Sequence, residues 1–215
     1  MFYYLFRIYR LLYGWLWNLR QKMLMAYLKK RLGHCGKNVV FHYSSQARAL
    51  SRIYMYDYTN IYHGFKFISY SGKFIMKKYA GAAEGLTVIT GNHTRQVGHF
   101  LKAYMDDRSS DCEKDVIVEE DVWLGANVTL CAGVKIGRGA NVGTGSVVRT
   151  NIPPYAITVG NPAKVIGFCF TPEEIIEHEK IQYPEEERLP MELLQKNYEK
   201  YFLKRIKEIK NFVKL

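Results

Sequence analysis

One histidine in this sequence is well placed for acid–base chemistry. Gly91-Asn92-His93-Thr94 comes directly after a short apolar segment, residues 86–90, which we predict to be a strand. Histidine is the side chain best suited to take a proton near neutral pH, and Gly91 permits an unusual backbone turn. His93 is therefore a candidate general base, with a purely structural loop histidine as the alternative. His99 lies further along the same segment and is less firmly anchored.

The segment that carries both histidines has no periodic apolar pattern. Residues 90–115 read TGNHTRQVGHFLKAYMDDRSSDCEKD, a polar run of mixed charge that is rich in Gly, Asp and Ser. Long segments without structure of their own are uncommon in compact domains and are usually functional. We therefore expect a loop extruded from the fold with the candidate base at its root; a disordered insertion is the alternative.

A repeat of six residues indicates the element that positions this loop. No α-helix has a period of six, and an ordinary half-buried strand has a period of two. A sustained hexapeptide repeat is the sequence signature of a parallel β-helix, in which each hexad is one short strand and a turn with Gly, Asn or Asp at the corner. The aliphatic residues in the strict repeat are Val118, Leu124, Leu130, Ile136, Val142 and Val148.

The period extends back towards the N-terminus in a degraded form. Before the loop the same spacing relates Met55, Ile61 and Phe67, and then Met76, Ala82 and Val88. The phase slips by three between the two sets, which predicts a corner insertion at residues 69–73. We assign residues 33–167 to the β-helix, including the loop at 90–115.

The segments on either side of the repeat differ from it. Residues 1–32 are aromatic and basic, and the chain, with a net charge of +11 over 215 residues, has its first acidic residue at Asp57. The longest uncharged run, residues 11–19, is too short to span a bilayer. An amphipathic helix in a membrane interface is one interpretation; packing on the β-helix or on a neighbouring subunit is the other. No nucleic-acid reader motif is present, so we expect no nucleic-acid partner.

The C-terminal segment, residues 168–215, is predicted to be helical. Thr171-Pro172-Glu173-Glu174 is a helix-start signal, because Thr can cap, Pro fits the first position and acids favour the first turn. Tyr183-Pro184 should end that helix, and residues 191–215 should form a second, amphipathic one. The four cysteines show no metal-ligand spacing and no secretory signal is evident, so we expect a reducing cytoplasm, with possible peripheral contact at the inner face of the membrane.

Residues 116–167 resemble the hexapeptide-repeat acyltransferases, closest to the group with streptogramin-type xenobiotic acetyltransferases and capsule or lipopolysaccharide O-acetyltransferases. The resemblance extends over residues 53–183, and Asn92-His93 matches the Asn-His of that family's active-site loop. The motifs that carry it are Val122-Trp123-Leu124-Gly125, Gly133-Val134-Lys135-Ile136-Gly137, Ile152-Pro153-Pro154-Tyr155 and Gly160-Asn161-Pro162-Ala163-Lys164-Val165-Ile166.

The resemblance implies a left-handed parallel β-helix that forms a homotrimer, with acetyl-CoA as donor, a hydroxyl as acceptor and no metal. His93 matches the catalytic histidine, and Asn92 and His99 are the candidate acceptor contacts. Many relatives place an Asp shortly after this histidine, where this chain has Arg95-Gln96-Val97. Asp106, Asp107 or a backbone carbonyl could therefore orient the His93 ring.

The resemblance also implies a donor site. Trp123 matches the tryptophan beside the cofactor arm, and Lys164 matches the basic residue near the phosphates, which cationic side chains suit. The corners that match the pantetheine contacts, followed by the pair near the nucleotide, are Gly125 and Ala126, Gly143 and Thr144, and Arg149 and Thr150. Simple corner geometry explains the glycines equally well, and a solvated surface is the alternative for Arg149 and Lys164.

Together these observations predict an acetyl-CoA-dependent O-acetyltransferase that acts on a saccharide, in bacterial surface-polysaccharide modification. A xenobiotic acetyltransferase, an N-acyltransferase of amino sugar nucleotides and a non-catalytic β-helix scaffold are the alternatives. A metal hydrolase of the carbonic-anhydrase type needs histidines on adjacent coils, and residues 116–167 contain none.

Overall fold

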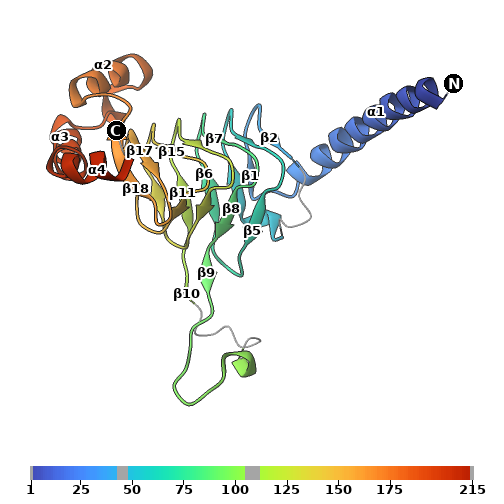
Figure 1. Ribbon diagram of the computed structural model, residues 1–215, viewed down its shortest axis with the longest axis horizontal. Coiled ribbons are helices and arrows are strands. Elements are labelled where there is room, and N and C mark those ends of the chain that lie inside the picture. Colours follow the sequence, from blue (N-terminus) through green and yellow to red (C-terminus); the bar gives the residue numbers. More distant parts are fainter. Residues whose placement is uncertain (1, 43–47, 105–111, 214–215) are drawn as a thin grey trace.

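Three parallel sheets run lengthwise through the molecule and form the faces of a prism (Figure 1). The computed structural model describes residues 2–42, 48–104 and 112–213. The chain visits the five-, seven- and four-stranded sheets in turn, so neighbouring strands in each sheet belong to successive coils and run parallel, except for the antiparallel pair β17 (Ala156–Val159) and β18 (Lys164–Phe168) at one end. The predicted left-handed parallel β-helix of hexapeptide repeats is confirmed.

The strands are short, and a complete coil, such as residues 53–68, contributes one strand to each face. The five-stranded sheet contains β1 (His34–Cys35), β3 (Ile53–Met55), β6 (Phe74–Met76), β11 (Val116–Val118) and β14 (Lys135–Ile136). The seven-stranded sheet contains β2 (Val40–Phe41), β4 (Asn60–Ile61), β7 (Gly81–Ala82), β12 (Trp123–Leu124), β15 (Asn141–Val142), β17 (Ala156–Val159) and β18 (Lys164–Phe168). The four-stranded sheet contains β5 (Lys66–Ile68), β8 (Thr87–Ile89), β13 (Thr129–Leu130) and β16 (Val147–Val148).

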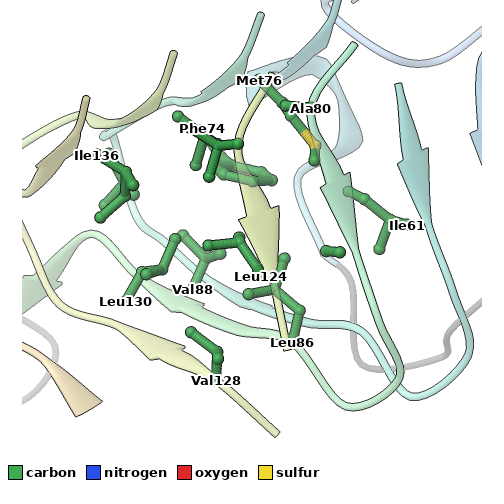
Figure 2. Close-up of a cluster of buried hydrophobic side chains, with 14 of the residues drawn as sticks. Ile61, Phe74, Met76, Ala80, Leu86, Val88, Leu124, Val128, Leu130 and Ile136 are labelled. Carbon is green, nitrogen blue, oxygen red and sulfur yellow. The ribbon is translucent and has the colours of Figure 1, made fainter. Parts of the chain in front are cut away.

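The core is a single column of side chains along the axis of the prism. Figure 2 shows side chains from all three sheets meeting in one interior, among them Phe74, Leu124 and Leu130. The six aliphatic repeat residues are at most 1% exposed, so the predicted register is correct. The phase slip is accommodated between β5 and β6, at residues 69–73.

The corners use more residue types than the repeat predicts. Every coil needs a left-handed residue between the five- and seven-stranded sheets, and Tyr58 (φ 60°), Tyr79 (φ 64°) and Tyr155 (φ 59°) adopt that conformation. The rings of Tyr58 and Tyr79 stack at 5.1 Å with an interplanar angle of 10°. The expectation that Gly, Asn or Asp takes the corners is therefore incomplete, because stacked aromatic rings can stabilise the same backbone.

Helix α1 (Phe2–Lys29) extends away from one end of the prism (Figure 1). Leu28 and Leu32 are buried at its base, and the Lys29 ammonium donates to the Val39 carbonyl. No helix within the described residues is long and apolar enough to cross a membrane.

The opposite end of the prism is covered by helices. The antiparallel pair β17–β18 leads into α2 (Pro172–Gln182), η3 (Glu185–Glu187), α3 (Met191–Tyr201), η4 (Leu203–Arg205) and α4 (Ile206–Val213). The predicted start of α2 is correct, since Thr171 and Glu174 form a reciprocal capping box. The single helix predicted for residues 191–215 is wrong. Helix α3 ends at Tyr201, and Phe202 leaves the helical conformation. The Arg205 guanidinium donates hydrogen bonds to the carbonyls of Tyr201 and Val165, and α4 folds back after this turn.

A buried carboxylate joins these helices to the β-helix. Glu179 is fully buried, and it accepts hydrogen bonds from Arg138 Nη1 at 3.2 Å, Tyr155 Oη at 3.0 Å and Leu189 N at 2.5 Å. Burial alone would lower the pKa of the Arg138 guanidinium, but Glu179, Tyr183 and Glu120 together outweigh burial and raise it. Burial, and then Glu179, raise the pKa of the Tyr155 phenol, so Tyr155 remains a hydrogen-bond donor.

Removing this carboxylate should weaken the attachment of the C-terminal helices. Glu179→Ala leaves Arg138 buried without its main anionic partner, and breaking a buried ion pair in this way costs about 3 kcal/mol or more. Equilibrium unfolding in denaturant measures the loss, with Glu177→Ala on the exposed face of α2 as the matched control. A loss below about 1 kcal/mol for Glu179→Ala would contradict this role.

Candidate active site

The extruded loop leaves the prism between β8 and β11 through a short antiparallel ribbon. β9 (Gly91–Asn92) pairs with β10 (Cys112–Glu113), with Gly91 opposite Glu113. Beyond the ribbon, the described part of the loop contains the short helix η2 (Leu101–Tyr104). In Figure 1 the ribbon and the loop project away from the prism. The sequence did not predict the ribbon, because two-residue strands have no detectable period.

Glu113 ties the root of the loop to the corner insertion at residues 69–73. Its Oε2 accepts hydrogen bonds from Thr90 Oγ1 at 2.5 Å and from Gly72 N at 3.1 Å, and its Oε1 accepts from Tyr70 N at 3.3 Å. Burial opposes ionisation, but these hydrogen bonds outweigh it and hold the pKa of Glu113 below its usual range. Sequence reasoning missed Glu113, since no motif marks it.

Gly91 has a different role from the one expected. It lies in β9, and its φ is outside the left-handed region, so the turn that we predicted there is wrong. A Cβ at this position would lie 2.5 Å from the Glu113 carboxyl carbon. Gly91 is therefore required because the Glu113 carboxylate approaches the backbone closely.

His93 directly follows this ribbon. Its side chain is half-buried, and its Nδ1 is shielded from solvent. Asn92 and His99 are exposed, with Asn92 on the ribbon and His99 further out on the loop. Asp106 and Asp107, which we considered as partners that orient the ring, lie outside the described residues.

The residues predicted to bind the donor fall into two groups on the prism. Trp123 lies on the outer face of the seven-stranded sheet, with its ring over Gly81 and 47% exposed. The next corner of the same coil, Gly125–Ala126, stacks directly on Gly143–Thr144: a Cβ on Gly125 would lie 2.7 Å from Thr144 N. This edge, between the seven- and four-stranded sheets, carries four of the predicted donor contacts, and Trp123 lies on the sheet face beside it.

The other edge of the four-stranded sheet carries the loop root and the second group. β8, β13 and β16 are neighbours in that sheet, so the residues that follow them share an edge. His93 follows β8 by way of the ribbon, and Arg149 and Thr150 follow β16 directly; both residues are exposed. The edge beside Trp123, which carries Gly125 and Thr144, is called the Trp123 edge below. Within one chain the four-stranded face therefore separates His93 from the Trp123 edge.

A small cavity brings Thr150 and Lys164 together. It has a volume of ≈ 250 Å³ and is also lined by Tyr201 and Arg205 from the C-terminal helices. Lys164 Nζ lies 3.6 Å from a Glu208 oxygen, so its charge is partly engaged. Hydrogen bonds from Arg205 hold the pKa of Glu208 below its usual range. Arg205 was missed from the sequence, because only the fold-back of α4 places it here.

Metal ions are usually held by clusters of His, Cys, Asp or Glu side chains. Within residues 2–42, 48–104 and 112–213, no three side chains of His, Cys, Asp or Glu gather closely enough to hold an ion.

Comparison with known proteins identifies the repeat and the fold. A family model for the bacterial transferase hexapeptide (six repeats) matches residues 115–150. A hexapeptide-repeat-containing acetyltransferase from Vibrio cholerae aligns with a TM-score of 0.58 and 20% identity, over 70% of this chain and 81% of that chain. An N-acyltransferase variant from Bacillus cereus, in complex with dTDP and coenzyme A, aligns with a TM-score of 0.57 and 20% identity, over 73% and 95%.

A maltose O-acetyltransferase from Clostridium difficile aligns with a TM-score of 0.52 and 24% identity, over 64% of this chain and 70% of that chain. A sequence search of the curated proteins finds no match. The chain thus carries the bacterial transferase hexapeptide repeat and has the fold of the hexapeptide-repeat acetyltransferases, as the sequence resemblance predicted.

The hydrogen bonds that Glu113 accepts from Thr90, Gly72 and Tyr70, called the Glu113 clamp below, should make the stability of the protein depend on pH. Because the pKa of Glu113 is lower in the folded protein than in the unfolded chain, its contribution is complete above the unfolded value and is lost as pH falls through the folded value. Glu113→Gln should lower the unfolding temperature at pH 7 by roughly 2–4 °C, equivalent to about 1 kcal/mol for this partly exposed group.

The difference between wild type and Glu113→Gln should shrink as the pH is lowered from 7 to 3 in thermal unfolding experiments. Glu177→Gln, an exposed substitution on α2, serves as the control and should show little difference at any pH. A Glu113→Gln deficit of the same size at pH 3 and pH 7 would exclude the ionised carboxylate as the stabilising group.

Proposed function

We propose that this protein is an acetyl-CoA-dependent O-acetyltransferase that acts on a saccharide hydroxyl. The observation that carries the proposal is the position of His93, half-buried at the root of a loop that Glu113 clamps to the coil below. The solved Vibrio cholerae and Clostridium difficile structures with this fold are described as an acetyltransferase and a maltose O-acetyltransferase, which supports the same reaction class here.

In this proposal His93 is the general base. A sugar hydroxyl is a weak nucleophile until a base removes its proton, and a positioned base contributes about 10²–10⁴-fold to the rate. The imidazole takes that proton as the hydroxyl oxygen bonds to the thioester carbonyl carbon. It then returns the proton to the sulfur when the carbon–sulfur bond breaks. A backbone N–H at a coil corner is the proposed donor to the oxyanion.

Each chain carries, on opposite edges of the four-stranded face, two groups of residues that together support donor binding in this proposal. The Trp123 indole is exposed and lies over a residue without a side chain, and nothing lies within 4 Å of a Cβ built on Gly145 at the corner beyond it. Lys164, Arg149 and Thr150 supply cationic and hydroxyl groups for phosphates at the other edge. Acetyl-CoA bound here would supply the activated acyl group.

We infer that the working unit is a homotrimer. His93 and the Trp123 edge are on opposite sides of the four-stranded face of one chain, so a site that uses both needs a second copy. In a three-fold assembly, the loop edge of one prism can face the Trp123 edge of the next, and each of three clefts then holds one base and one donor site.

The proposed setting is the cytoplasm, in the modification of a bacterial surface polysaccharide. The aromatic and basic α1 favours an acceptor that is assembled beside a membrane over a freely diffusing drug. An N-acyl transfer to an amino sugar nucleotide is the second candidate, because the Bacillus cereus structure with this fold is an N-acyltransferase in complex with dTDP and coenzyme A. Mild alkali releases an O-acetyl group but not an amide, which separates the two.

Calorimetric titration of the full chain with acetyl-CoA tests the donor site. We expect saturable binding near one per chain, and a decrease in affinity of about tenfold or more for Trp123→Ala, which removes an exposed aromatic contact. A dephospho-analogue reports on the phosphate contacts and a desulfo-analogue on the contacts of the sulfur. Ile181→Ala, at a more exposed apolar position on α2, is the control. Failure to bind at millimolar donor would favour the scaffold alternative.

Turnover with a panel of saccharide acceptors tests the base. His93→Ala should lower kcat by about 10²–10⁴-fold while leaving the acetyl-CoA affinity nearly unchanged. His34→Ala, an exposed histidine on β1, is the matched control and should retain full activity. If His93→Ala kept most of its rate, another group would have to be the base.

A further inference from the structure

Helix α1 presents large apolar side chains to solvent in almost every direction. Tyr3, Tyr4, Leu5 and Phe6 are consecutive, so at 100° per residue they cover most of the helix circumference, and each is more than half exposed. The pattern continues through Leu11, Leu12, Trp15 and Leu16. A soluble helix normally exposes polar residues, and contiguous apolar surface of this kind marks an interaction site.

One narrow polar stripe interrupts this surface. Arg7, Arg10, Gly14 and Asn18 are spaced by three, four and four residues, which places them on one face of the helix. Leu5, Ile8, Leu12 and Leu19 repeat at helical spacing on the opposite face. The helix therefore has a broad apolar arc and a thin cationic edge.

The charge of this region is of one sign. Residues 1–32 contain Arg7, Arg10, Arg20, Lys22, Lys29, Lys30 and Arg31, and no acidic residue occurs before Asp57. The partner that complements such a segment is an apolar medium bordered by anionic groups.

We propose that α1 lies in the interface of a membrane that contains anionic lipids. The apolar arc enters the boundary between headgroups and acyl chains, and the arginines contact lipid phosphates. Trp15 suits this depth because its exposed ring is apolar and carries one polar N–H. The helix lies along the surface, since no described helix is apolar enough to cross.

A lipid surface explains α1 better than a second copy of this chain does. A helix–helix seam covers only the side chains at two of every seven positions, which would leave many aromatic residues exposed. A second copy of α1 would also offer no acidic partner to Arg7 and Arg10, because the helix contains no acidic residue. Anionic lipid removes both problems.

The base of α1 connects the membrane contact to the β-helix. Trp17 lies 5.6 Å from the His63 ring, and a cavity of ≈ 610 Å³ between α1 and the first coils is lined by Met25, Lys29 and His42 among others. The body of the prism would therefore be held beside the bilayer. This inference does not depend on acetyl transfer, because lipid binding needs neither donor nor acceptor.

Co-sedimentation of the full chain with vesicles tests the proposal. Neutral vesicles contain phosphatidylcholine alone, and anionic vesicles contain phosphatidylcholine with phosphatidylglycerol. We expect binding to anionic vesicles that weakens at high salt. Arg7→Gln combined with Arg10→Gln should weaken it about thirtyfold, the loss expected for two cations at a charged surface. Leu5→Glu combined with Leu12→Glu should abolish it.

Two controls make the outcomes decisive. Ile181→Glu, at an exposed apolar position on α2, should leave vesicle binding unchanged. Light scattering without vesicles should give the same mass for wild type and for the Leu5→Glu, Leu12→Glu double variant. Absence of binding to anionic vesicles, or binding that ignores lipid charge and the two arginines, would overturn the proposal. A change in mass would overturn it in favour of α1 docking on another copy.

Discussion

The structure depends on one constraint: a coil of this β-helix cannot bury its side chains alone. Each coil contributes a few aliphatic groups to a narrow column, and its backbone groups are paired only by the coils above and below. Stacking therefore preserves both period and register across interruptions. β11 pairs with β6 in parallel, with Val116 opposite Phe74, although the long loop separates it from the preceding coil. A long insertion is tolerated because loop-closure entropy grows only slowly with length.

That tolerance is what allows a rigid scaffold to carry a projecting loop. The cost of the insertion is limited further because Glu113 and Asp115 satisfy backbone donors of residues 70–73 as the chain re-enters the stack. The candidate base thus directly follows a strand whose partner, β10, carries Glu113 and is tied to the stacked coils. The same logic applies at the opposite end, where Glu179 connects the covering helices to Arg138 and Tyr155.

The two edges of the four-stranded face carry different kinds of residues. One edge carries corners that stack tightly, such as Gly125 on Thr144, while the loop edge holds the titratable group. One chain keeps these features apart, so assembly becomes part of the proposed site. At the N-terminal end, α1 adds a third surface of different chemistry, apolar and cationic, that the β-helix itself does not use.

The repeat, its register, the corner insertion, the extruded loop and the start of α2 could be predicted from the sequence, because a strict period and a capping box are local patterns. The sequence also singled out His93 and the Trp123 corner. Other features became evident only in the folded chain: the role of Gly91, the hydrogen bonds of Glu113, the Tyr corners, the end of α3 before Phe202 and the approach of Arg205 to Lys164. Each of these rests on a contact between residues far apart in the chain, and such contacts leave no periodic trace in the sequence.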